Sequence, residues 1–78
     1  MSPKERLEAI ERGVSQDTGI PLERLRAAYA LKYGMFVIVL NLFTEKSYAT
    51  LSHDSSSSDD EIISYFVRKI RSDYPSLL

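Results

Sequence analysis

The chain has 78 residues, which allows one domain and leaves no room for a two-domain enzyme, an eight-stranded α/β barrel or a repeat array. Hydrophobic residues make up 44% of the chain and charged residues 27%, which is typical of a globular protein rather than a disordered one. Ten basic and eleven acidic side chains give a formal charge of −1, so no global charge attracts nucleic acid or an anionic membrane.

A first helix is predicted over residues 3–13. Ser2 is a favourable N-cap, Pro3 suits the first helical position, and Glu5 completes a capping box. An apolar stripe at helical spacing follows, made of Leu7, Ile10 and Val14. We expect Gly13 to end this helix, because glycine costs about 1 kcal/mol relative to alanine inside one.

A second helix is predicted over residues 21–33. Pro21 suits its first position, and Gly34 lies where a glycine often ends a helix. The apolar face of this helix would consist of Leu22, Leu25, Ala28 and Tyr29.

A β-hairpin is predicted next, with strands over residues 35–43 and 47–52, because the first of these segments is short and rich in β-branched residues. A turn that ends at Ser47 would place Phe43 opposite Tyr48 and give every residue of the hairpin a definite face.

The two faces of this hairpin differ in composition. One is wholly apolar and consists of Phe36, Ile38, Leu40, Leu42, Ala49 and Leu51. The other is mixed and consists of Met35, Val37, Val39, Asn41, Phe43, Tyr48 and Thr50. Either a helix covers each face, or the helices share one face and leave the mixed face as a contact surface.

A polar, serine-rich linker is predicted over residues 52–58 and a last helix over residues 59–73. Ser58 and Glu61 form a second capping box, and Pro75 stops the helix. The buried stripe of this helix would be Ile63, Phe66, Val67 and Ile70. The sequence therefore predicts a single α+β domain over residues 1–78, in the order ααββα, with an antiparallel hairpin packed against the helices.

Residues that could carry catalysis are few. The chain has no cysteine, which excludes disulfides and thiolate nucleophiles, and its one histidine cannot build a multi-histidine metal site. His53 precedes Asp54, but no nucleophile is suitably placed beside them. The acids at 59–61 are explained by helix capping, and the serines at 55–58 by a flexible linker or by phosphorylation. We expect no enzyme, no catalytic residue, no metal and no cofactor.

Residues 11–30 resemble a helix-turn-helix. Val14, Gly19, Ile20 and Leu25 match the apolar and turn positions of that motif, and residues 18–26 are similar to recognition helices of MerR-type regulators. The resemblance implies that Arg24, Arg26 and Lys32 would face DNA.

The function that we expect is non-catalytic binding of another protein, as a regulator or inhibitor that also forms a homodimer. Phage and plasmid accessory proteins are often of this size, which is an analogy only. The protein-binding residues would be Met35, Val37, Val39, Phe43 and Tyr48 of the mixed face. A DNA-binding regulator that uses residues 11–30 is the alternative. No apolar run reaches the roughly 20 residues that span a membrane, so we expect a cytoplasmic protein without a membrane partner.

Overall fold

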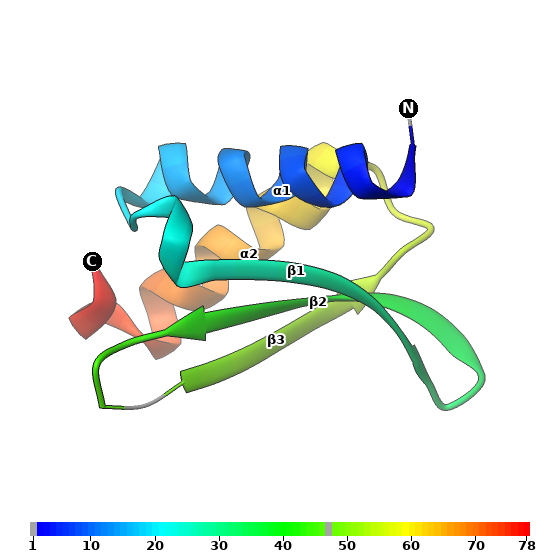
Figure 1. Cartoon of the computed structure of the whole chain (residues 1–78). Helices are drawn as coiled ribbons and strands as arrows, with labels where there is room; N and C mark the ends of the chain where they lie inside the picture. Colours follow the sequence, from blue (N-terminus) through cyan, green and yellow to red (C-terminus); the bar gives the residue numbers. More distant parts are fainter. Residues whose placement is uncertain (1, 47) are drawn as a thin grey trace.

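The computed structural model describes residues 2–46 and 48–78 as one helix, a three-stranded antiparallel sheet and a second helix (Figure 1). In chain order the elements are α1 (Pro3–Thr18), the 3-10 helix η1 (Leu22–Arg24), β1 (Leu25–Lys32), β2 (Met35–Phe43), β3 (Tyr48–Asp54), α2 (Asp59–Asp73) and the 3-10 helix η2 (Pro75–Leu77). The predicted α+β class, with a hairpin packed against helices, is confirmed. The predicted order ααββα is wrong, because the second helix is replaced by a strand.

The first helix is longer than predicted. Its start is confirmed, since the Ser2 hydroxyl accepts a hydrogen bond from the Glu5 amide and the Glu5 carboxylate accepts one from the Ser2 amide. Gly13 lies inside α1 and does not end it. It faces α2, where a side chain at this position would collide with Ile63. The helix ends at Gly19, whose φ of 80° is the left-handed conformation of a C-cap glycine.

The predicted helix over residues 21–33 is wrong. Only η1 is helical there, and residues 25–32 form β1, which pairs with β2 from Leu25 opposite Leu42 to Lys32 opposite Met35. Gly34 belongs to a two-residue hairpin turn rather than to a helix end. The segment forms a strand although its Leu, Arg, Ala and Lys residues favour a helix, because it pairs with β2 along its whole length and Leu25 joins the core.

The predicted pairing of the second hairpin is confirmed. Phe43 lies opposite Tyr48, and the register continues to Leu40 opposite Leu51. Ser47, where the second strand was predicted to begin, lies outside the described residues. The strand runs on to Asp54, so the predicted linker over 52–58 is shortened to the four residues between β3 and α2.

The last helix has the predicted bounds. The Ser58 hydroxyl accepts a hydrogen bond from the Glu61 amide, as expected for an N-cap. Ile62 takes the buried position that the sequence analysis gave to Ile63, which is only half-buried at the edge of the core.

Both helices lie on the same face of the sheet, with α1 over β1 and α2 over β3 (Figure 1). The core between them is apolar and consists of Ile10, Val14, Ile20, Leu25, Ile38, Leu40, Leu42, Leu51, Ile62, Phe66 and Ile70. Within residues 2–46 and 48–78, no polar or charged side chain is fully buried. The opposite face of the sheet, which we call the open face, has no helix over it.

Candidate interaction surface

The open face is defined by the residues of each strand that point away from the helices. Strand alternation and the observed register assign to it Arg26, Ala28, Ala30 and Lys32 of β1, Met35, Val37, Val39, Asn41 and Phe43 of β2, and Tyr48, Thr50, Ser52 and Asp54 of β3. Its centre is apolar, and its charges lie on the two outer strands. In the open face, the Thr50 hydroxyl donates a 2.8 Å hydrogen bond to Asn41 Oδ1 across the strands.

Four of the five residues predicted to bind protein contribute surface. Met35, Phe43 and Tyr48 are exposed and Val39 is half-buried. Val37 lies between Ala30 and Asp54 in the central strand and keeps only 6% of its surface exposed, so it supports the face from within. The sequence left open whether a helix covers each face of the hairpin or the helices share one face. In the structure both helices lie on one face.

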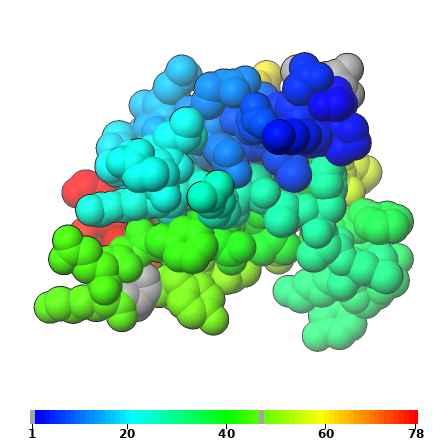
Figure 2. Space-filling model, in the orientation of Figure 1, coloured from blue at the N-terminus to red at the C-terminus, as the bar shows by residue number. Residues whose placement is uncertain are grey.

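A second feature of the surface is the tip of the β1–β2 hairpin, which we call the arm (residues 31–36). It extends past the helices, and Figure 2 shows it standing off from the body of the molecule with a hollow between them. Its exposed apolar residues are Leu31, Tyr33, Met35 and Phe36, with Tyr33 96% exposed. Sequence reasoning missed the arm, because it placed Phe36 on the covered face and Tyr33 in a helix.

The turn at the end of the arm is strained. Tyr33 has a φ of 52° and Gly34 a φ of 78°, as a two-residue type I′ turn requires. A left-handed backbone suits Asn or Gly and disfavours a bulky residue. Tyr33 therefore occupies a conformation that its side chain does not favour, at a point where that side chain contacts almost nothing of its own chain.

The residues expected to face DNA do not form a recognition helix. Arg24 lies in η1, and Arg26 and Lys32 lie near opposite ends of β1. The helix-turn-helix resemblance is therefore wrong as a structural prediction, because its second helix is absent.

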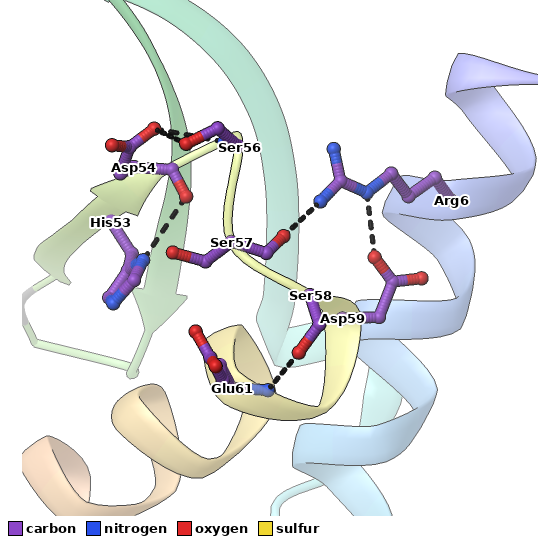
Figure 3. A network of polar contacts seen from close by, with 8 residues as sticks. All are labelled: Arg6, His53, Asp54, Ser56, Ser57, Ser58, Asp59 and Glu61. Carbon is purple, nitrogen blue, oxygen red and sulfur yellow. Dashed lines mark hydrogen bonds and ion pairs between the residues drawn. The ribbon is translucent and has the colours of Figure 1, made fainter.

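A polar network ties α1 to the segment that leads into α2 (Figure 3). Arg6 Nε donates a 2.7 Å hydrogen bond to Asp59 Oδ1, and Arg6 Nη2 donates one of 2.9 Å to the Ser57 carbonyl. The bond to Asp59 raises the pKa of Arg6 above its already high ordinary value, so the guanidinium keeps its charge. Its geometry joins the starts of the two helices, which is a structural role.

The possible catalytic pair His53–Asp54 is not assembled. His53 Nδ1 lies 3.1 Å from the backbone oxygen of Asp54, not from its carboxylate (Figure 3). The His53 ring packs edge-on against Tyr65. The Asp54 carboxylate instead accepts hydrogen bonds from the amide and hydroxyl of Ser56, and these bonds lower the pKa of Asp54.

The acids at the start of α2 do not gather into a metal site either, and no group of three or more metal-binding side chains occurs in the described part of the chain. The described residues also line shallow hollows that are open to solvent, of which two follow. One is lined by Arg24, Thr44, Glu45, Lys46, Ser76 and Leu77, and the other by His53, Asp60, Glu61, Ser64 and Arg68.

Comparisons with known proteins add nothing to this geometry, since no protein-family model, curated protein or solved structure matches the chain. Neither described helix has the length and apolar character needed to cross a membrane. The candidate site is therefore defined by the open face and the arm alone.

Proposed function

We propose that this chain is a small protein-binding domain that acts without catalysis, as a regulator or inhibitor, through the open face and the arm. The observation that carries the proposal is the arm: Leu31, Tyr33, Met35 and Phe36 are all large, apolar and at least half exposed on one short hairpin. Leu31 and Phe36 point to the helix side of the sheet and Met35 to the open face, so the arm presents apolar side chains on both sides. Exposed apolar side chains gathered in this way are typical of a protein contact site.

The size of the exposed surface supports the same conclusion. The chain exposes 5082 Å², whereas the scaling law for compact monomers gives about 4,800 Å² for a chain of this mass. The arm leaves the body of the molecule instead of packing on it, so its apolar side chains stay exposed. Tyrosine, phenylalanine and methionine are also enriched at protein interfaces, where their large side chains fill pockets of a partner.

The charges of the open face fit a protein partner better than a nucleic acid. Arg26 and Lys32 lie on β1, whereas Asp54 lies on β3, so positive and negative groups are at opposite sides of an apolar centre. A phosphate backbone would require a predominantly positive surface.

Photo-crosslinking in the native cell tests the proposal. A photoreactive phenylalanine analogue is placed at Phe36 or at Tyr48, and as a control at Arg68, which is exposed on α2. We expect a discrete protein adduct from the first two positions and none from the third. Purification of the adduct then allows the affinity of the identified partner to be measured directly.

A matched pair of variants shows whether the adduct depends on the open face. Val39→Lys places a charge at its centre, and Ser64→Lys places the same side chain on the exposed side of α2. We expect Val39→Lys to weaken binding at least tenfold and Ser64→Lys to leave it unchanged, with both variants folded by circular dichroism. Equal binding by both variants, or a discrete adduct from Arg68 alone, would refute the proposal. If Val39→Lys unfolds, the adducts from Phe36 and Tyr48 decide.

A further inference from the structure

The outer edge of β1 has unused backbone hydrogen-bonding groups. The sheet order is β1-β2-β3, so β1 has a strand neighbour on one side only. The Leu25 amide donates to the Leu22 carbonyl and the Ala27 amide donates to Glu11 Oε2 at 2.7 Å. Both amides therefore point away from β2.

Because backbone groups alternate along a strand, the next outward-pointing residues are Tyr29 and Leu31. The side chain of Glu11 caps Ala27, but within residues 2–46 and 48–78 no such cap is seen at the amides of Tyr29 and Leu31. An exposed edge of this kind is a template for pairing with another strand.

We propose that a second copy of this chain pairs antiparallel with this edge, β1 against β1, and makes a continuous six-stranded sheet. Tyr29 of each copy lies opposite Leu31 of the other, and Ala30 lies at the two-fold axis. This register is the one that joins both uncapped residues to each other. Shifting the register in one direction would pair Ala27, whose amide already donates to Glu11. Shifting it in the other direction would pair Tyr33, which belongs to the turn.

The side chains agree with this register. Tyr29 and Leu31 point to the helix side of the sheet, where they are 38% and 66% exposed, and pairing would place each against the other across the strands. Ala30 is small enough to meet its own copy at the axis. Lys32 lies opposite Ala28 of the second copy, so no like charges face each other directly.

The paired state deepens the proposed function, on which it rests, because it adds the second copy at the edge. It takes up Leu31 of the arm and leaves the open face free for another protein. The ladder is short, so its buried area lies at the small end of protein interfaces. We therefore expect a reversible dimer with a dissociation constant on the order of micromolar.

Sedimentation from low micromolar to near-millimolar concentration tests the dimer, together with two variants. Leu31→Pro removes the outward amide and leaves the β2 ladder intact, since proline is tolerated where an edge amide faces solvent. Leu31→Val keeps the amide and is the matched control. We expect a concentration-dependent dimer for the parent protein and for Leu31→Val, and at least a tenfold weaker dimer for Leu31→Pro.

Amide hydrogen exchange of the unsubstituted protein keeps the proposal testable if Leu31→Pro fails to fold. The amides of Tyr29 and Leu31 should gain protection as concentration rises, whereas the Ala27 amide, capped by Glu11, should be protected at every concentration. A monomer throughout the range, or exchange at Tyr29 and Leu31 that does not change with concentration, would overturn the pairing. A dimer that Val39→Lys dissociates and Leu31→Pro does not would overturn it too, because the open face would then be the dimer contact.

This result is separate from that of the proposed function. If Leu31→Pro abolishes the dimer and the crosslink from Tyr48 to another protein persists, both hold. If the crosslink is absent and the dimer forms through β1, only the proposed function fails.

Discussion

The close approach of the two helices at Gly13 gives a quantitative prediction. A Cβ atom at this position would lie 2.5 Å from Ile63 Cδ1 and 3.1 Å from Ile63 Cγ1, inside the roughly 3.5–4.0 Å of ordinary carbon contacts. Alanine gains about 1 kcal/mol of helix propensity over glycine. An extra methyl group in a packed contact costs about 1–3 kcal/mol. We therefore expect Gly13→Ala to change the free energy of unfolding by between zero and about −2 kcal/mol.

A double-mutant cycle separates these two contributions. In an Ile63→Ala background the colliding atoms are absent, so Gly13→Ala should raise the free energy of unfolding by about 1 kcal/mol. The coupling between the two positions should then be about 1–3 kcal/mol. Thermal and urea unfolding followed by circular dichroism measure it, and each 1 kcal/mol corresponds to a Tm shift of about 4–8 °C in a domain of this size.

One outcome would show that Ile63 is not the reason for a glycine at position 13. If Gly13→Ala stabilises the parent protein as much as it stabilises the Ile63→Ala variant, Ile63 does not restrict position 13, and close helix packing is not the reason for a glycine there.

Three further predictions concern the arm and the polar network. Tyr33→Asn should raise the free energy of unfolding by about 1 kcal/mol, because asparagine accepts a φ of 52° more readily, and yet weaken partner binding; an unchanged Tm would contradict the strain. Arg6→Ala should lower the free energy of unfolding by about 1 kcal/mol, whereas Lys69→Ala, which removes a more exposed ion pair, should lower it by less; urea unfolding would contradict this if both variants lost the same free energy. Ser56→Ala should raise the pKa of Asp54 toward its usual value, so that the variant should lose the stability that the charged carboxylate contributes above that pKa and should depend less on pH as pH falls; an NMR titration with no change would contradict the assigned hydrogen bonds.

The elements that the sequence predicts well are those with signals at both ends. Helix α2 has an N-cap at Ser58 and a proline at 75, and its bounds are as expected. The β2–β3 register follows from alternation, because a shift of one residue would turn Leu40 and Leu51 away from the core.

Strand β1 was not predicted, because its sequence fits both the helical period and the alternation of a strand. Leu25, Ala28 and Tyr29 have helical spacing, while Leu25, Ala27, Tyr29 and Leu31 alternate as in a strand. Pairing with β2 along the whole strand selects the strand over the helix. This pairing cannot be seen from the sequence of residues 25–32 alone.

The candidate surface was predicted only in part for a related reason. Alternation assigned Phe36 to the helix side of the sheet, and the observed pairing with Leu31 agrees with that side. It does not tell how far the helices reach, and the arm extends past them. The apolar side chains of the arm therefore remain exposed although their face was assigned correctly.

The order in which the chain is synthesised determines when the helix side of the sheet becomes covered. Helix α1 is made first, but Ile10 and Val14 on its buried side share a core with Ile62, Phe66 and Ile70 of α2, which is made last. The three strands lie between the two helices in the sequence and pair with their sequence neighbours, so the sheet can form early from local contacts. A nascent chain that stops before residue 59 would therefore carry a sheet with neither face fully covered. Completion of α2 is the step that covers the helix side of the sheet, and it ends the period in which the apolar core residues of the sheet are exposed to aggregation.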